Sequence, residues 1–449
     1  MIVAALASCQ KEEDTLPTLE PTSNAAASRW ILDVMSEVYY WLDDLATPID
    51  ENSDPEDYYE ALLNRPTDRF SAIYPDYEEL LNSLNGISLE AGYEFILFRE
   101  SNSSENVIAE ISYIKKNSPA FSAGLRRGDV IQKINGTQIT VSNYRELLAK
   151  TELQHTVSYI RFNEELNGFE VQPDLSLTPI QLSENPNFLD SIYTIGNQKI
   201  GYVVYHFFAP GSGEGSTSYD DEMDDIFANF KANGINHLIV DFRYNSGGFV
   251  SSAINLASLI APGANQSTIF SKTKYNSLVM QEIPELRNQQ TAFKLKTQNL
   301  GSTLTGNKVY ILTSNRTASA SELIINGLKP FMDVYLIGDL TTGKNVGSIA
   351  LKDEENPQNK YGLLPIVSQS FNSLDQSDYS TGFTPNITLK ESSERLLPLG
   401  DTNELLLRTA ISQITGLSPS GRFQKLDRLD IGSTLDYKIR SGKMIETWK

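Results

Sequence analysis

The chain has 449 residues, of which 37 are Lys or Arg and 57 are Asp or Glu, so its formal net charge is −20. This length predicts about two or three domains, and a hydrophobic content of 40% is enough to fill their cores. Nucleic-acid-binding proteins depend on a basic face, so the strongly acidic balance excludes a nucleic-acid partner.

The only cysteine, Cys9, stands near the start of the sequence, so no internal disulfide can form. It ends a short apolar run, and Leu6-Ala7-Ser8-Cys9 resembles the lipobox of bacterial lipoproteins. The resemblance implies lipidation of Cys9 and a lipid-anchored place in the bacterial cell envelope, at the outer membrane and either periplasmic or surface-exposed. Residues 10–14 are polar and acidic, which fits a surface-export signal or a plain tether. We therefore expect residues 1–27 to be a lipoprotein signal and a flexible tether, with membrane contact through the lipid alone, because no later segment is apolar enough to span a bilayer.

Residues 28–85 predict a small helical region. Apolar residues recur at three- or four-residue steps from Trp30 to Trp41. Asp54-Pro55-Glu56 is typical of a second helix start, and an acidic helix is predicted near residues 77–84.

Residues 86–165 carry an ordered set of local signals. Strands are predicted over residues 93–98 and 107–114, a helix start at Ser118-Pro119 and a hairpin turn at Asn135-Gly136. A further helix is expected over residues 141–148. This order resembles that of a PDZ domain.

PDZ domains bind an extended C-terminal peptide as an added strand, and backbone N–H groups hold its carboxylate. On the resemblance, the peptide-binding residues are Ala91, Gly92, Tyr93, Glu94 and Phe95. The loop departs from the usual Gly-Leu-Gly-Phe type, so the ligand preference stays open. A purely structural spacer domain is the alternative.

Residues 166–449 are expected to form the largest domain together with a C-terminal tail. Residues 166–196 contain three prolines and predict a loop-rich connection. A buried strand follows over 199–208, and a helix over 220–233. Another helix is predicted over 403–414, whereas the last 30 residues show no usable motif.

A central parallel strand is predicted over residues 238–243 and runs into a loop that contains Gly247 and Gly248. Two glycines let the backbone approach a ligand closely, and a helix predicted from Val250 turns its N–H groups toward the same sheet edge. A plain glycine-rich turn is the alternative. Asp241 and Arg243 are expected to be structural partners.

The stretch Thr317-Ala318-Ser319-Ala320-Ser321-Glu322 lies between a predicted strand at 308–313 and a predicted helix from Ser321 to Leu328. A hydroxyl at such a turn meets helix N–H groups that lack partners, so it can act as a nucleophile beside an oxyanion site. Ser and Thr are also ordinary helix caps, which is the alternative interpretation.

Lys344 follows the next predicted strand, over residues 334–337. Strand, helix and strand form a βαβ unit, so Ser319 and Lys344 could meet at one edge of the sheet. A serine needs a base, and none of the three histidines stands in a recognisable triad motif. Lys344 is the better candidate if burial lowers its pKa from about 10.4. A solvent-exposed loop lysine is the alternative.

Residues 317–322 and Gly343-Lys344 resemble the active-site signature of the carboxyl-terminal processing (tail-specific) serine peptidases, family S41. The resemblance implies an α/β core of the ClpP/crotonase-like type, a mixed sheet flanked by helices, preceded by a PDZ domain and a small helical region. It also implies that Ser319 is the nucleophile and Lys344 the general base.

In this family the Gly-Gly loop lines the oxyanion site, which implies that Gly247 or Gly248 acts there together with Ala320. Family members often carry a glutamine four residues after the lysine to orient it. This chain has Ser348 at that position, which is a possible orienter with a shorter reach.

The leading hypothesis is a serine endopeptidase that cuts unfolded or C-terminally exposed chains presented by the PDZ groove. It needs no cofactor and no metal, and no His/Cys cluster with ligand spacing stands in the sequence. One alternative is a catalytically inactive, peptide-binding envelope lipoprotein on a protease scaffold. A weaker one is a retinoid- or polyketide-binding relative of the fold. The physiological substrate and the oligomeric state stay open.

Overall fold

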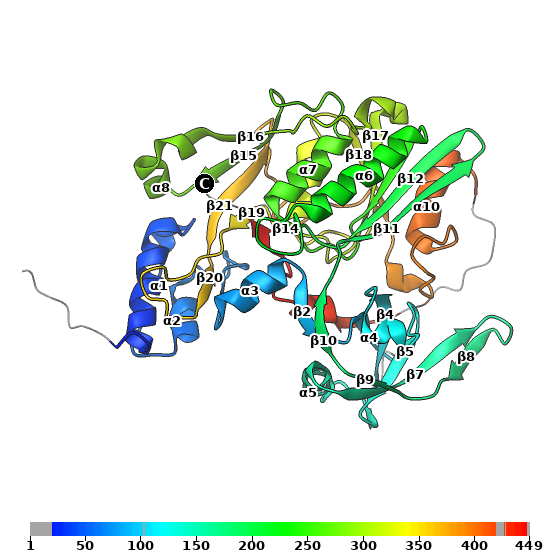
Figure 1. Cartoon of the computed structure of the whole chain (residues 1–449), viewed down its shortest axis with the longest axis horizontal. Helices are drawn as coiled ribbons and strands as arrows, with labels where there is room; N and C mark the ends of the chain where they lie inside the picture. Colours follow the sequence, from blue (N-terminus) through cyan, green and yellow to red (C-terminus); the bar gives the residue numbers. More distant parts are fainter. Residues whose placement is uncertain (1–19, 102–103, 419–425, 427, 447–449) are drawn as a thin grey trace, which may run out of the picture.

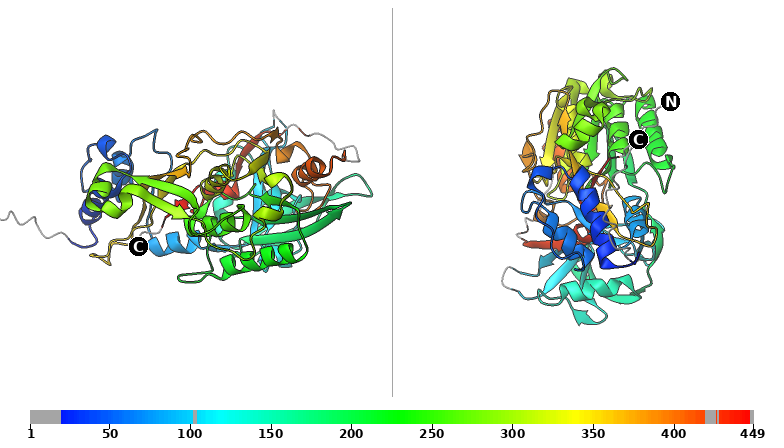
Figure 2. Two further views of the ribbon diagram at one scale, coloured as in Figure 1. Left: turned by 90° about the horizontal axis from the view of Figure 1, so that it is seen from above. Right: turned by 90° about the vertical axis from the view of Figure 1, so that its left-hand side faces the viewer.

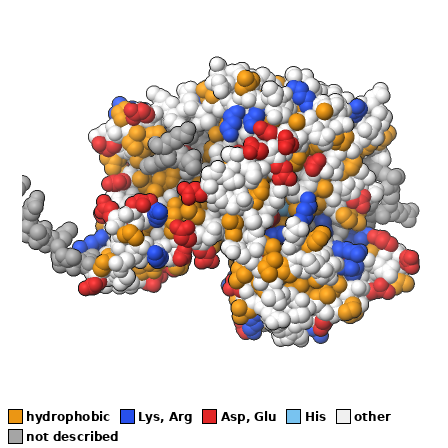
Figure 3. All heavy atoms as spheres, viewed as in Figure 1, with side chains coloured by type: hydrophobic (Ala, Val, Ile, Leu, Met, Phe, Trp, Pro, Cys, Tyr) orange, Lys and Arg blue, Asp and Glu red, His pale blue; other side chains and the backbone are white. Residues whose placement is uncertain are grey.

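A computed structural model describes residues 20–101, 104–418, 426 and 428–446, so the predicted lipidation site Cys9 lies outside the described residues. Figure 1 shows helices α1 and α2 at one end, an α/β core, and a smaller β-rich unit beside the core. Seen from above, the N-terminal helices form one end of an elongated molecule (Figure 2). A notch in the outline separates this end from the β-rich unit, and acidic and basic side chains are interspersed over the face drawn in Figure 3. Among the helices of the described part, none has the length and apolar character needed to cross a membrane.

The N-terminal region is helical, as predicted. Asp54 caps α2 by accepting a hydrogen bond from the N–H of Glu56, which confirms the predicted helix start. The two first helices pack on each other around Ile31 and Leu62. The elements are α1 (Asn24–Val38), η1 (Leu42–Asp44), α2 (Pro55–Leu62), β1 (Ala72–Tyr74) and α3 (Tyr77–Leu84).

The predicted PDZ region forms an antiparallel sheet in the order β23-β3-β4-β5-β7-β8. Asn135 and Gly136 join β5 to β6 with φ of 51° and 73°, as a tight hairpin turn requires. The edge strand β23 (Asp430–Ser433) comes from the far end of the chain. The other elements are β2 (Ile87–Glu90), β3 (Tyr93–Arg99), β4 (Val107–Ile114), α4 (Pro119–Ser122), β5 (Val130–Ile134), β6 (Thr137–Gln138), α5 (Tyr144–Ala149), η2 (Lys150–Glu152), β7 (His155–Asn163), β8 (Gly168–Val171) and β9 (Leu175–Leu177).

The prediction of a loop-rich connection over residues 166–196 is wrong. Besides β8 and β9, these residues form β10 (Ile180–Ser183) and β11 (Asn187–Ile195), which pair with β2 and β12. Their three prolines stand between the strands, where a missing N–H costs no ladder hydrogen bond. The prediction was wrong because it took the prolines as signs of a loop-rich region, whereas they mark the breaks between short strands.

The core is built on a six-stranded sheet in the order β11-β12-β13-β17-β18-β22, parallel except for β11. Helices α6, α7 and α9 cover one face and α10 the other, which confirms the expected mixed sheet flanked by helices (Figure 1). The elements are β12 (Gln198–Tyr205), α6 (Ser218–Ala232), β13 (His237–Asp241), α7 (Val250–Ile260), β17 (Lys308–Thr313), α9 (Ala320–Leu328), β18 (Asp333–Gly338), β22 (Ile387–Thr388) and α10 (Leu405–Thr415).

A second sheet has the order β14-β24-β19-β21-β15-β16. Its strand β24 (Met444–Ile445) belongs to the end of the sequence and lies between β14 and β19. We call residues 430–446 the returning segment, because they run from the PDZ sheet back to the core. The remaining elements are β14 (Gly248–Phe249), β15 (Ile269–Tyr275), α8 (Ser277–Glu282), η3 (Pro284–Asn288), β16 (Gln289–Ala292), η4 (Gly301–Thr303), η5 (Thr305–Asn307), β19 (Val346–Ser348), β20 (Gly362–Leu364), β21 (Ile366–Asn372), η6 (Glu391–Ser393) and η7 (Thr434–Tyr437).

A buried ionic network joins these parts. Arg243, at the end of β13, pairs with Asp241 at 2.8 Å and with Glu391 and Glu404 at 2.6 Å each. Arg127 of the PDZ region reaches the same Glu391 at 2.5 Å. Asp241 and Arg243 are thus structural partners, as expected.

Candidate active site

Ser319 occupies the turn between β17 and α9, in a conformation that side-chain-bearing residues rarely adopt. Its φ is 64° and its ψ is −116°. The residue is fully buried, and its Oγ has no hydrogen-bond partner among the described residues. A strained backbone and an unpaired buried hydroxyl are both typical of a functional site.

Glu322 holds the backbone on both sides of the site. Its carboxylate accepts hydrogen bonds from the N–H groups of Ser319 at 2.9 Å, Gly343 at 2.7 Å and Lys344 at 2.8 Å. The hydroxyl of Thr341 donates to it at 2.6 Å. Burial raises the pKa of Glu322, and these hydrogen bonds oppose the rise.

Glu322 stood in the sequence motif without an assigned role. The spacing from Ser319 to Glu322 is that of a capping box, in which a glutamate reaches back to the N–H of the cap residue. That signal could have identified Glu322. Sequence reasoning could not show that the same carboxylate also binds the lysine loop.

Lys344 is fully buried, so it is not an exposed loop lysine. Its amine donates a hydrogen bond to the carbonyl of Gly442 at 2.7 Å and lies 5.0 Å from the centre of the Phe70 ring. Burial holds the pKa of Lys344 well below its ordinary value, and the nearby charge of Lys443 lowers it further, whereas Asp68 and Glu322 oppose the shift. Ser319 Oγ and Lys344 Nζ do not form a hydrogen bond with each other in this structure.

The Gly-Gly loop contacts Ser319. A Cβ placed on Gly247 would lie 2.7 Å from the Cβ of Ser319. The N–H of Gly247 is bound by the side chain of Asn245 at 2.9 Å, whereas that of Gly248 donates to the carbonyl of Lys443 at 2.6 Å. Of the two predicted oxyanion glycines, Gly248 is therefore the one whose N–H points to the returning segment.

Ala320 begins α9, so its N–H lies in the first turn, where intrahelical partners are lacking. The predicted oxyanion residues thus come from two elements, Gly248 from β14 and Ala320 from the start of α9.

Ser348 is buried in β19, and its hydroxyl has no hydrogen-bond partner among the described residues. Its carbonyl accepts a hydrogen bond from the N–H of Glu446 at 2.9 Å. The amine of Lys344 is held by Gly442 instead, so the orienting role of Ser348 stays a prediction.

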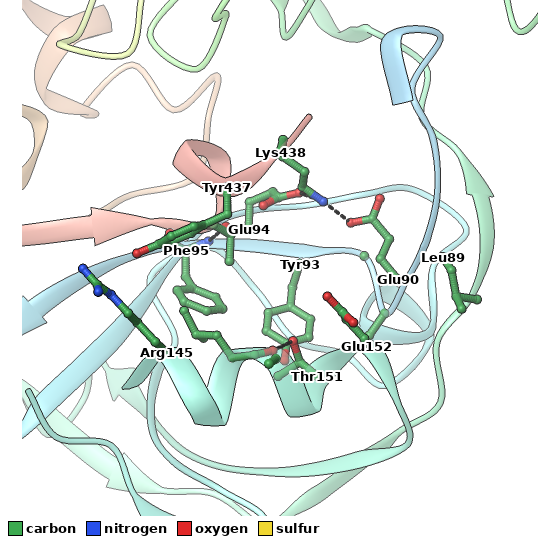
Figure 4. A pocket seen from close by; sticks show the side chains of 15 residues that line it. Leu89, Glu90, Tyr93, Glu94, Phe95, Arg145, Thr151, Glu152, Tyr437 and Lys438 are labelled. Atoms are coloured by element: carbon green, nitrogen blue, oxygen red, sulfur yellow. Dashed lines mark hydrogen bonds and ion pairs between the residues drawn. The ribbon is translucent and has the colours of Figure 1, made fainter. Parts of the chain in front are cut away.

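The five predicted PDZ residues, 91–95, line a cavity of about 450 Å³ that also borders α5 (Figure 4). The returning segment contributes to the wall, since Tyr437 lies beside Phe95 and Lys438 forms an ion pair with Glu90 at 2.8 Å. Strand β23 pairs antiparallel with β3 further along the same edge. The edge of β3 that borders the predicted peptide groove is therefore partly paired with the chain's own strand β23.

Within the part of the chain that the structure describes, no three His, Cys, Asp or Glu side chains are grouped to hold a metal ion. The candidate chemistry lies in the serine, the lysine and the backbone N–H groups around them.

The fold and this site resemble those of serine peptidases that carry a PDZ domain. Residues 199–389 match the model of peptidase family S41, residues 26–72 that of the peptidase S41 N-terminal domain, and residues 110–161 a PDZ domain. Its core thus matches peptidase family S41, and the chain is similar to C-terminal processing proteases of that family.

Two curated relatives illustrate the likeness. The "Probable CtpA-like serine protease" of Staphylococcus aureus (strain COL) is 21% identical over 278 residues, which cover 61% of this chain and 48% of that protein. The "Carboxy-terminal processing protease CtpB" of Bacillus subtilis is 24% identical over 327 residues, which cover 70% of this chain and 57% of that protein. The chain thus spans about half the length of the curated relatives it matches.

Among solved structures, the "Putative S41 protease" from Bacteroides fragilis NCTC 9343 has 29% sequence identity and a TM-score of 0.71. The match covers 87% of this chain and 98% of that chain. The likeness therefore extends over most of the chain.

Proposed function

We propose that this protein is a serine endopeptidase in which Ser319 is the nucleophile and Lys344 the general base. The observation that carries the proposal is the complete burial of Lys344, which favours a neutral amine, in a site where one carboxylate binds the backbone of both residues. A neutral lysine is the form that can accept a proton.

In the proposed reaction, Ser319 Oγ attacks the carbonyl carbon of the substrate peptide bond while its proton passes to Lys344 Nζ. The developing oxyanion accepts hydrogen bonds from the N–H groups of Gly248 and Ala320. Collapse breaks the C–N bond, and Lys344 returns the proton to the leaving amine. Water then hydrolyses the acyl-enzyme by the same proton transfers. Ser348 would accept a hydrogen bond from the amine and orient it.

Substrate recruitment is assigned to the PDZ cavity. Residues 91–95 and α5 border an opening that suits the end of an extended peptide, and the substrates would be unfolded or C-terminally exposed chains. The printed name of the Bacillus subtilis relative, a carboxy-terminal processing protease, supports this class of substrate.

Hydrolysis of an unfolded protein substrate tests the proposal, with wild type compared with Ser319→Ala and Lys344→Met. Both variants should lose turnover, because each removes one member of the dyad. Lys329→Met is the control, since desolvation also lowers the pKa of Lys329 although this lysine is exposed and lies outside the candidate site, and it should stay active. Robust hydrolysis by Ser319→Ala or Lys344→Met would contradict the dyad and favour a peptide-binding protein without catalysis.

We also propose that Cys9 carries a lipid anchor that places the protein in a bacterial cell envelope. Labelling with a radioactive fatty acid in a bacterial host tests this, because wild type should incorporate the label and Cys9→Ala should not. Equal labelling of the two would contradict the anchor.

A further inference from the structure

The returning segment runs through the candidate active site and meets its polar groups. The carbonyl of Lys443 accepts a hydrogen bond from the N–H of Gly248 at 2.6 Å, and the carbonyl of Gly442 accepts one from Lys344 Nζ at 2.7 Å. These two donors are the ones assigned above to the oxyanion site and to proton transfer. The segment thus occupies the place that a substrate carbonyl would need.

The segment enters this place as an extended strand. Strand β24 pairs in parallel with β14 on one side and with β19 on the other, where Ile445 lies opposite Ser348. The N–H of Glu446 donates to the carbonyl of Ser348 at 2.9 Å. Peptides that bind by strand addition are held in the same way, by main-chain hydrogen bonds along an open strand edge.

The side chains of the segment fill separate sites. Met444 is fully buried in the core cluster. The carboxylate of Glu446 accepts hydrogen bonds from Ser368 at 2.6 Å and Tyr275 at 3.0 Å. The amine of Lys443 donates to the carbonyl of Phe70 at 3.4 Å. Such successive fitted positions are typical of a peptide-binding cleft.

The part of the segment before the cleft is fixed by ion pairs. Arg440 pairs with Glu184 at 2.7 Å, and Lys438 pairs with Glu90 at 2.8 Å and Glu94 at 3.1 Å. Buried charges need such partners, so releasing this stretch carries an electrostatic cost.

From these contacts we infer that residues 442–446 are an intramolecular ligand of the peptidase cleft, with Lys443 in the position of the residue whose carbonyl is attacked. The arrangement is latent: Lys344 is engaged by Gly442, and Ser319 Oγ has no hydrogen-bond partner among the described residues. A substrate strand must displace the segment before it is cut. The inference rests on the proposed function, because it takes its register from the proposed oxyanion donor.

The inference also describes the substrates that fit. The position of Lys443 takes a long side chain that reaches Phe70, and the position of Met444 takes a large apolar one. Extended segments with these two neighbouring residues are therefore the preferred class.

Two truncations test the displacement. A chain that ends at Ser441 lacks the cleft strand, whereas the control that ends at Glu446 keeps it. Because a cis ligand lowers the competent fraction of the enzyme, the first should hydrolyse an unfolded substrate at least about fivefold faster than wild type, and the control should match wild type. A folded Ser441-ending chain that is no faster than wild type would overturn the inference.

A second measurement requires neither truncation nor turnover. Full-length Ser319→Ala is incubated with a synthetic peptide of the sequence of residues 439–446, and hydrogen exchange is followed at residues 443–446. These amides should be protected without the peptide and exchange faster once it competes for the cleft. Unchanged protection at saturating peptide, or no protection at the outset, would overturn the inference. Displacement without hydrolysis by wild type would instead contradict the proposed function alone.

Discussion

The carboxylate of Glu322 accepts a hydrogen bond from the backbone N–H of Lys344 at 2.8 Å, which links the first turn of helix α9 to the lysine loop that follows β18. The same carboxylate holds the N–H of Ser319. One side chain therefore fixes the relative position of the two residues proposed to carry out the chemistry.

Replacing Glu322 with Ala should destabilise the protein strongly. The change leaves three backbone N–H groups and the Thr341 hydroxyl without an acceptor. Since each buried unsatisfied donor costs about 1–3 kcal/mol, a loss of at least about 3 kcal/mol is expected in urea unfolding. Glu322→Gln keeps one carbonyl oxygen and should lose less. Equal unfolding midpoints for wild type and Glu322→Ala would contradict this role.

The pH dependence of hydrolysis should report the buried lysine. Only the neutral amine of Lys344 accepts a proton, so kcat/KM rises with pH through its pKa and is constant above it. Burial and Lys443 lower that pKa while Asp68 and Glu322 oppose the shift, so the midpoint should lie well below the value of about 10.4 for a free lysine. A profile with its midpoint at about 10.4 would contradict a buried neutral base.

The N–H of Gly248 should be needed for the rate of the chemical step. Its φ is 133°, and a Cβ at this position would overlap the carbonyl oxygen of Phe208, so Gly248→Ala must move the loop. Loss of one oxyanion donor lowers kcat by about 10²–10³-fold. Gly263→Ala is the matched control, because Gly263 also has a positive φ but its Cβ would meet open space. Similar kcat values for the two variants would show that Gly248 is not a donor.

The buried network around Arg243 should be essential for stability. Arg243→Met leaves the carboxylate of Asp241 without its cation, and leaves Glu404 with only Arg127 at 3.9 Å. Removing one partner of a buried ion pair costs about 3–5 kcal/mol. The control Arg29→Met breaks the half-exposed pair with Glu51 and should change stability little. Thermal unfolding of the two variants tests this prediction. Equal shifts in their melting temperatures would contradict a stabilising role for the Arg243 network.

The PDZ cavity should affect substrate binding more than catalysis. Ala149 is exposed and borders the cavity, so Ala149→Trp fills it without disturbing the core. We expect a higher KM for protein substrates with free C-termini and an unchanged kcat for a short peptide. Lys150→Trp, on the neighbouring exposed residue, is the control. An unchanged KM for Ala149→Trp would contradict recruitment through this cavity.

The sequence predicted those parts of the fold that local patterns determine. The βαβ unit around Ser319 was predicted correctly because two apolar runs flank a helix start in sequence order, and β17 and β18 do pair in parallel. The same holds for β4, found at the predicted residues 107–114, and for α3 at residues 77–84.

Other features depend on contacts between residues far apart in sequence. Strand β24 has two residues, too few for any periodicity, and it exists because β14 and β19 provide pairing edges on both sides. The strained φ of Ser319 likewise depends on Glu322, which binds its N–H, and on the Gly247 loop packed against its side chain. A single sequence shows neither partner.

The path of the returning segment has a mechanical consequence. Strand β23 lies on the edge of β3, where a PDZ ligand would add, and a short covalent stretch connects it to β24. A guest peptide that occupied the whole edge of β3 would have to displace β23. Because Lys438 and Arg440 are held by ion pairs between the two strands, these pairs would also have to break before β24 is released. Peptide binding at the PDZ sheet and release of the strand at the candidate active site would then be coupled through one covalent segment, without a change of shape within either domain.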